Sequence, residues 1–301
     1  MPLKAQEIAQ RLQILAAGVC HAGQHCCKGM PLLCVLFLLL ASGQGIAFQD
    51  EPVAGAVLLR VAGNVEVAES ITRQLAPASL TKLALAVVAL ESDPMRRDVL
   101  VRISQAAAGQ TGSRLGLREG EKLKSSDLLA ATLIASANDA CLALAEHVAG
   151  SPQGAVKRMN KLSRRLGMSA TLFMDPCGHD HPAQKTTARD LTRLADAAMR
   201  HPRILEIAGT REMQIATADG RRRFALKNTN LLLGSYPGVV GLKTGYTTRA
   251  GRCLIALARR DGIELLLVLL AAEDRWETAV RLLDAGFERA RSQPPGEGPF
   301  R

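Results

Sequence analysis

A serine and a lysine stand three residues apart at the start of a strongly apolar segment, PASLTKLALAVVALE, residues 77–91. At positions i and i+3 of a helix, the side chains of Ser79 and Lys82 share one face and can meet. A lysine in the first turn opposes the helix dipole, and burial favours its neutral amine. A neutral amine can take a proton from a hydroxyl, so the pair predicts a serine nucleophile with a lysine base.

Ser79 by itself also has a structural explanation, because serine is a favoured residue at a helix N-cap. Lys82 has no such explanation, since an unpaired buried cation costs free energy. Lowering a lysine pKa from its ordinary value to neutrality needs about three units, or roughly 4 kcal/mol. One helix end supplies about 1 kcal/mol of this, so we expect a second positive charge near Lys82.

Two further motifs meet that need. SAN, residues 136–138, interrupts a helical pattern, and KTG, residues 243–245, opens the C-terminal strand region. Each motif alone is explained more simply as a helix cap or the start of a strand. With the Ser79–Lys82 pair, in this order and in these contexts, they predict a single site.

Short strands are predicted at both ends of the folded part of the chain. Residues 54–69 predict a hairpin around Gly63-Asn64, and later hairpins are predicted around Asp219-Gly220 and Asp261-Gly262, before a closing helix at residues 275–291. Because strands at both ends enclose a helical middle, we expect them to share one antiparallel sheet in an α+β domain packed by helices.

Helices are predicted between these strands. Residues 125–150 read as two helices separated by the polar SAND break, and an amphipathic helix within residues 155–166 ends at Gly167. Thr187 and Asp190 form a pair like a capping box at the start of a helix over residues 188–200.

Composition limits the class of protein. The chain has 301 residues, 48% of them hydrophobic, and a formal net charge of +10. Six Phe, two Tyr and one Trp offer little for stacking on bases, and the basic residues are scattered. We therefore expect a large globular core and no nucleic-acid partner.

The first 47 residues differ from the rest. PLLCVLFLLLA, residues 31–41, is too short to span a membrane, which takes about 20 residues, and small residues follow it up to Ala47. This pattern predicts a signal peptide and an exported protein, periplasmic or otherwise extracytoplasmic. Met30 is an alternative start, and a buried helix is an alternative structure. We expect a domain at 48–290 and a flexible tail at 291–301.

Outside the predicted leader, the chain has three cysteines, Cys141, Cys177 and Cys253. Three cysteines do not make a disulfide framework, and a domain of this size needs none. Cys177, His179 and His181 suggest zinc, but a fourth ligand is not evident. A surface loop near the cleft is the simpler explanation, and we expect no metal.

The three motifs resemble the SxxK, SxN and KTG signature of penicillin-binding proteins and serine β-lactamases. Residues 53–287, including GSRLGLREGEKL, TTARDLTRLADAA and GLKTGYTTRAGRCLIALARRDG, resemble the D-alanyl-D-alanine carboxypeptidases among the low-molecular-mass penicillin-binding proteins, peptidase family S11. The resemblance implies the β-lactamase-like transpeptidase fold with a helical subdomain. It also implies a serine-type D-alanyl-D-alanine carboxypeptidase that acts on peptidoglycan stem pentapeptides, needs no cofactor and is inhibited by β-lactam antibiotics.

The resemblance implies a role for each motif residue. Ser79 would be the acylated nucleophile and Lys82 its base. Ser136 would pass a proton to the leaving D-alanine, and Asn138 would orient Lys82 and the substrate amide.

The substrate-binding residues would belong to the third motif. Lys243 would lower the pKa of Lys82 and attract the substrate carboxylate, which Thr244 could hydrogen-bond. Gly245 would leave room for an extended peptide beside the strand. The backbone N–H groups of Ser79 and Tyr246 would form the oxyanion hole.

The chain departs from the family pattern at several places. DPCGHDHP, residues 175–182, stands where relatives commonly carry Asn-Pro followed by Gly-Leu, and Thr229 stands where some carry an arginine that holds the carboxylate. The added β-rich domain and C-terminal membrane helix of longer members are not evident, so we expect no stable membrane anchor.

Three alternatives remain open. A peptidoglycan D,D-endopeptidase of the same family cuts after the same residue and differs in the leaving group. A class A β-lactamase would need an ExxLN glutamate, and Glu146, Glu206 and Glu212 do not lie in that pattern. A non-catalytic penicillin-binding relative would not need the intact set of motif side chains.

Overall fold

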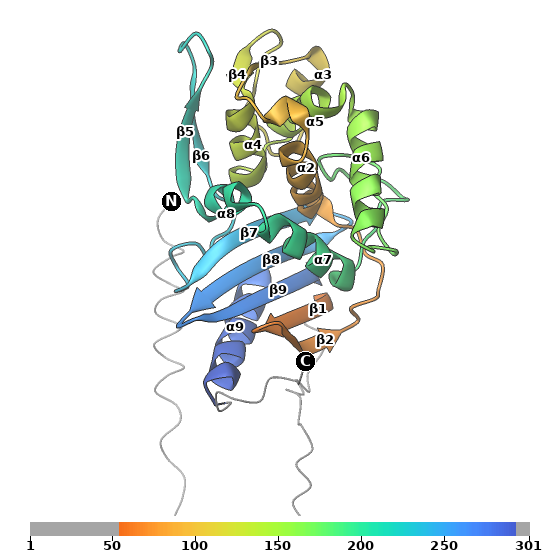
Figure 1. Cartoon of the computed structure of the whole chain (residues 1–301), viewed down its shortest axis with the longest axis vertical. Coiled ribbons are helices and arrows are strands. Elements are labelled where there is room, and N and C mark those ends of the chain that lie inside the picture. Colours follow the sequence, from red (N-terminus) through yellow and green to blue (C-terminus); the bar gives the residue numbers. More distant parts are fainter. Residues whose placement is uncertain (1–53, 293–301) are drawn as a thin grey trace, which may run out of the picture. The chain divides into compact units, whose positions relative to one another are not determined.

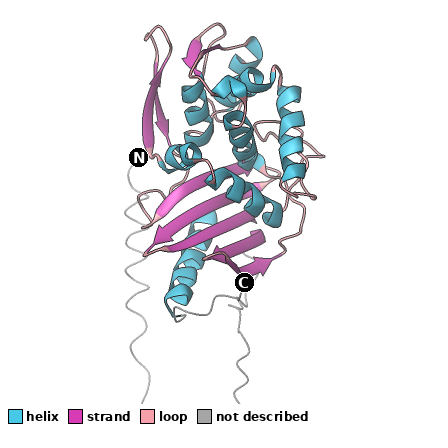
Figure 2. Cartoon of the chain, viewed as in Figure 1, coloured by secondary structure: helices cyan, strands magenta, loops and turns pink. Residues whose placement is uncertain are grey.

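The structure is a computed structural model that describes residues 54–292. The predicted leader, the alternative start at Met30 and residues 293–301 of the predicted tail lie outside the described residues. A five-stranded antiparallel sheet has the order β2-β1-β9-β8-β7 (Figures 1 and 2). Its strands are β1 (Ala54–Val61), β2 (Asn64–Glu69), β7 (Val239–Thr247), β8 (Gly251–Arg260) and β9 (Ile263–Ala272).

Helices cover both faces of the sheet (Figure 1). The helices of the described residues are η1 (Ala78–Leu80), α2 (Thr81–Leu90), η2 (Asp93–Met95), α3 (Gln105–Ala108), α4 (Ser125–Ile134), α5 (Asn138–Ala149), α6 (Pro152–Arg165), α7 (Ala188–Met199), α8 (Pro202–Gly209) and α9 (Arg275–Ser292). Two small two-stranded sheets complete the fold: β3 (Leu100–Arg102) with β4 (Lys122–Lys124), and β5 (Glu212–Ala216) with β6 (Arg223–Lys227).

The alternation of side chains along β9 builds two cores. Leu266, Val268 and Leu270 belong to the larger core, which includes α2, α4, α5 and α7. The intervening residues Leu265, Leu267 and Leu269 belong to a second core with the buried side of α9. Successive side chains of a strand point to opposite faces, so a strand buried on both faces is a continuous apolar run.

The first and last strands share the sheet, as predicted, because β1 pairs with β9 in antiparallel register. The three predicted hairpins are present, with turns at Ala62-Gly63, Asp219-Gly220 and Asp261-Gly262. Asp261 and Gly262 both have positive φ, at 51° and 78°, which suits a two-residue hairpin turn. The α+β prediction is confirmed.

The predicted helices are also present, although the amphipathic helix α6 begins at Pro152, before the predicted segment. Residues 135–137 separate α4 from α5, and Gly167 follows α6 with a φ of 68°. Asp190 N donates to Thr187 Oγ1 at 3.1 Å, so Thr187 caps α7. Among residues 54–292, no helix combines the length and hydropathy that crossing a membrane requires.

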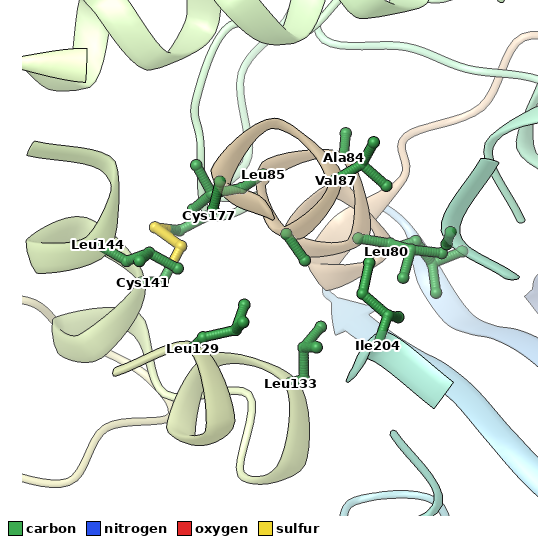
Figure 3. Close-up of a cluster of buried hydrophobic side chains, with 14 of the residues drawn as sticks. Leu80, Ala84, Leu85, Val87, Leu129, Leu133, Cys141, Leu144, Cys177 and Ile204 are labelled. Atoms are coloured by element: carbon green, nitrogen blue, oxygen red, sulfur yellow. A yellow bond between two sulfur atoms is a disulfide. The ribbon is translucent and has the colours of Figure 1, made fainter. Parts of the chain in front are cut away.

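The expectation about cysteines is wrong for one pair, because Cys141 and Cys177 form a disulfide. The bridge joins α5 to the loop after α6 and lies among buried leucines (Figure 3). The two cysteines are 36 residues apart, and no local spacing signals a contact set by the packing of a helix against a loop. The Cys177 sulfur of the zinc alternative is thus bonded to Cys141. Within the described part of the chain, no group of three or more His, Cys, Asp or Glu side chains is arranged so that it could hold a metal ion.

Candidate active site

Ser79 lies in η1, immediately before α2. The N-cap residue of α2 is Leu80, and the Ser79 hydroxyl lies 2.9 Å from Lys82 Nζ. The capping explanation for Ser79 therefore does not apply. Ala78 has a φ of 47°, a left-handed conformation that turns the chain just before the serine.

Lys82 is completely buried in the first turn of α2. Its Nζ lies 2.9 Å from Ser79 Oγ, 2.8 Å from Asn138 Oδ1 and 2.6 Å from the carbonyl oxygen of Cys177. Burial lowers the pKa of Lys82 from 10.5 to about 7, and the Asp175 carboxylate opposes part of this shift. A large fraction of the Lys82 side chains therefore carries the neutral amine at physiological pH.

The three neighbours of Lys82 define what a neutral amine does there. An unprotonated amine has two N–H bonds and one lone pair. The oxygens of Asn138 and Cys177 can only accept, so they take both hydrogens. The lone pair is then left for the hydroxyl of Ser79, so this arrangement allows proton transfer from Ser79 to Lys82.

Ser136 and Ala137 lie in the break between α4 and α5, Asn138 is the first residue of α5, and Ser136 has a φ of 57°. Asn138 Nδ2 donates to the carbonyl of Thr111 at 2.7 Å, which fixes the amide with Oδ1 toward Lys82. Sequence reasoning missed the next residue, Asp139. Its buried carboxylate accepts backbone N–H groups from residues 115–117 and so ties that loop to the start of α5.

Lys243 is the second buried lysine, and it contacts the SAN segment. Its Nζ donates to Ser136 Oγ at 3.0 Å and to the Thr244 carbonyl at 3.1 Å. Burial lowers the pKa of Lys243 well below its usual value, and the charges of Lys82 and Arg275 lower it further. A second buried lysine is therefore part of the site, but the low pKa of Lys82 is caused by burial, and a charge on Lys243 is not among its causes.

Strand β7 forms the edge of the sheet nearest Ser79. A Cβ on Gly245 would lie 3.1 Å from the Cβ of Ala78 and 3.2 Å from Ser79 N, so glycine permits this close approach. The side chain of Tyr246 is 62% exposed, and Arg275 Nη1 donates to the Gly245 carbonyl at 2.7 Å. Arg275 supports the strand, and no sequence signal pointed to it.

Thr229 lies beside the third motif. Its hydroxyl oxygen is 2.6 Å from that of Thr244, so the residue at the arginine position of some relatives does reach the KTG strand.

The loop at residues 175–181 approaches Ser79 and Lys82 from the other side. The Asp175 carboxylate accepts the N–H groups of Cys177, Gly178 and His179 at 2.8, 2.6 and 3.0 Å. Burial would raise the pKa of Asp175, but hydrogen bonds from His179 and the backbone outweigh it and lower the pKa. The loop is therefore part of the site, which sequence reasoning described only as a surface loop near the cleft.

Comparison with known proteins gives the family. The family model for D-alanyl-D-alanine carboxypeptidase, Peptidase S11, matches residues 53–274. The D-alanyl-D-alanine carboxypeptidase DacF of Bacillus subtilis is 32% identical over 278 residues, which cover 87% of this chain and 71% of the relative. A D-alanyl-D-alanine endopeptidase of Pseudomonas aeruginosa is 31% identical over 232 residues, 76% of this chain and 74% of the relative.

A solved structure agrees with this assignment. Penicillin-binding protein D2 from Listeria monocytogenes, in an ampicillin-bound form, matches with a TM-score of 0.68 and 29% identity, over 78% of this chain and 98% of that chain. The likeness confirms the predicted α+β fold of penicillin-binding proteins. The chain belongs to the D-alanyl-D-alanine carboxypeptidase family, peptidase family S11, and is a serine hydrolase.

Proposed function

We propose that this protein removes the terminal D-alanine from peptidoglycan stem pentapeptides through an acyl-enzyme on Ser79. The observation that carries the proposal is the set of contacts around the buried Lys82. Two obligate acceptors, Asn138 Oδ1 and the Cys177 carbonyl, leave the amine lone pair to the Ser79 hydroxyl. A low-pKa lysine beside a serine is suited to activating that serine as a nucleophile.

The reaction proceeds in two steps. Ser79 Oγ attacks the carbonyl carbon of the penultimate D-alanine, and its proton passes to Lys82 Nζ. The C–N bond to the terminal D-alanine breaks, and the proton held by Lys82 passes to the leaving nitrogen by way of the Ser136 hydroxyl, whose Oγ contacts Lys243. Water then hydrolyses the ester and frees Ser79.

The substrate would lie along β7 as an added strand, because β7 is an edge strand of the sheet and lies beside Ser79. The terminal carboxylate would meet Lys243 and the paired hydroxyls of Thr244 and Thr229. The backbone N–H groups of Ser79 and Tyr246 would stabilise the tetrahedral oxyanion.

Benzylpenicillin tests the nucleophile. Intact-mass and peptide mass spectrometry should find one covalent adduct per chain, on Ser79, and the variants Ser79→Ala and Lys82→Met should form none. Lys157→Met, at an exposed lysine of α6, should form the adduct as the wild type does. Folded wild-type protein that forms no adduct on Ser79 would overturn the proposal.

The endopeptidase alternative has one observation in its favour, which is that a relative of similar identity carries that name. Purified protein should be incubated in parallel with pentapeptide monomers and with cross-linked dimers. We expect free D-alanine and tetrapeptide from the monomers. Cleavage of the dimers alone would make the protein an endopeptidase.

We also propose that residues 1–47 are a cleaved export signal, that residues 48–290 form the catalytic domain and that the remainder is a tail. The disulfide between Cys141 and Cys177 supports an extracytoplasmic location, because such bonds persist in oxidising compartments. N-terminal sequencing of the protein from the extracytoplasmic fraction should start at Phe48. A full-length chain found only in the cytoplasm would contradict this proposal.

A further inference from the structure

His179 contacts the amide that holds Lys82, and the reaction described above gives it no role. Its side chain is 37% exposed, in the loop at residues 175–181. Its Nε2 lies 3.1 Å from Asn138 Nδ2, and its Nδ1 lies 3.2 Å from an Asp175 oxygen. The imidazole therefore bridges a carboxylate and the asparagine of the second motif.

The contacts of Asn138 determine which nitrogen of His179 carries the proton. Asn138 Oδ1 faces Lys82 Nζ, and Nδ2 faces the Thr111 carbonyl, so the amide cannot be flipped without losing both hydrogen bonds. An amide nitrogen only donates, so His179 Nε2 must accept and carry no hydrogen. The proton of the neutral ring then lies on Nδ1 and is donated to Asp175.

We propose that His179 is a positioning residue that acts only as the neutral, Nδ1-protonated imidazole and holds Asn138 in the orientation that directs Lys82 toward Ser79. Protonation of His179 would place an N–H against the Asn138 NH₂ group, where no acceptor remains. The inference rests on the proposed acylation of Ser79. It adds a second proton-dependent group, besides Lys82, to that step.

The charged groups around His179 come from several elements. Asp175 lies on the same loop, and Lys82 on α2 lies behind Asn138. From the β7–β8 side, Thr247 donates to Asp180, and Arg249 donates to the His181 carbonyl. Among the described residues, the His179 ring itself has hydrogen-bond contacts with Asp175 and Asn138.

The test compares two variants. Glutamine in His179→Gln can place an oxygen near the position of Nε2 and accepts at every pH, whereas His179→Leu removes the acceptor. The second-order rate of Ser79 acylation by a fluorescent penicillin should be measured from pH 5.5 to 9 for the wild type and both variants. His181→Gln makes the same change at a neighbouring histidine, whose Nδ1 accepts the N–H of Ala183, and it serves as the matched control.

At pH 8 we expect His179→Gln to acylate within about threefold of the wild type and His179→Leu to be about tenfold slower. Lys82 is present in the wild type and in both variants, so the effect of its titration cancels when the acylation rate of one protein is divided by that of another at the same pH. The ratio of wild type to His179→Leu should fall toward one as the pH decreases, while the ratio of His179→Gln to His179→Leu should stay near tenfold. A purely structural role would make both ratios independent of pH, and equal rates for His179→Leu and wild type at pH 8 would overturn the inference.

The position of the proton on the His179 ring can be measured separately, by a method that does not depend on activity. Long-range ¹H–¹⁵N NMR of the folded protein should show a protonated Nδ1 and an unprotonated Nε2 for His179, assigned by its loss in His179→Gln. A ring protonated at Nε2 would contradict the inference. A wild type that forms no Ser79 adduct would refute the proposed function, whereas a normal adduct with the wrong tautomer would refute only the role of His179.

Discussion

At the scale of single residues, the burial of Lys82 is a cost to the folded protein. The side chain is fully buried, and its pKa of about 7 is below the value of 10.5 for a solvated lysine. The folded state disfavours the ammonium form, because the desolvation of a charge is only partly offset by hydrogen bonds to neutral oxygens. The same effect that reduces stability makes the amine able to accept a proton.

This cost has a definite pH dependence. Between pH 7 and pH 10.5 the unfolded chain binds more protons at Lys82 than the folded protein does, so its contribution to stability rises with pH. Below pH 7 the whole penalty is present, about 5 kcal/mol from a shift of about 3.5 units. Lys82→Met removes the penalty but leaves two oxygens unpaired at every pH.

We therefore predict that Lys82→Met gains stability relative to the wild type as the pH falls from 9 to 6. Urea unfolding at both pH values measures the difference in unfolding free energy. The exposed-lysine variant Lys157→Met should show no comparable change between the two pH values. A difference between Lys82→Met and wild type that does not vary with pH would refute the assignment of the low pKa to Lys82.

At the scale of elements, two segments pack closely against η1 and fix the position of Ser79. Strand β7 approaches through Gly245, and the loop at residues 175–181 approaches through Gly178. Gly178 has a φ of 90°, and a Cβ there would lie 2.1 Å from the carbonyl oxygen of Ala78. That carbonyl belongs to the backbone, which has little freedom to move away.

Gly178→Ala should destabilise the protein and also slow the acylation of Ser79, because the backbone before the serine has to shift. Gly63→Ala is the matched control, since Gly63 has the same φ of 90° but no atom within 4 Å of the added Cβ. Its cost should be that of backbone strain alone, about 1 kcal/mol. Thermal unfolding and the acylation rate should be measured for both variants. Equal effects would show that the contact with Ala78 does not matter.

At the scale of the whole molecule, the candidate site joins segments that are far apart in the chain. Lys82 contacts Asn138, 56 residues away, and the carbonyl of Cys177, 95 residues away. The Cys141–Cys177 bridge ties the last of these segments to α5 within the core (Figure 3). The disulfide therefore constrains the carbonyl that binds the candidate base.

The variant Cys141→Ala/Cys177→Ala should lose stability and acylate Ser79 more slowly. Closing a loop of 36 residues corresponds to about 4 kcal/mol in the chain-entropy description. Cys253→Ala, at a buried thiol outside the bridge, controls for the loss of a buried sulfur. Urea unfolding and penicillin acylation provide the two measurements. A double variant as stable and as reactive as Cys253→Ala would exclude a role for the bridge.

The sequence alone was enough for the features that depend on local spacing. The pair Ser79 and Lys82 shares a helical turn, so its contact follows from the three-residue spacing. Turn residues such as Asp261-Gly262 located hairpins, and the position of strands at both ends predicted the shared sheet. These features are set within a few residues or by the order of elements.

Only the tertiary structure decided what surrounds the Lys82 amine. The Cys177 carbonyl, the bridge to Cys141 and the contact from His179 to Asn138 join segments whose proximity no local pattern encodes. Complete burial, rather than the second lysine, turned out to be the main cause of the low pKa of Lys82. Desolvation depends on every atom packed around a charge, so it exists only once the chain has folded.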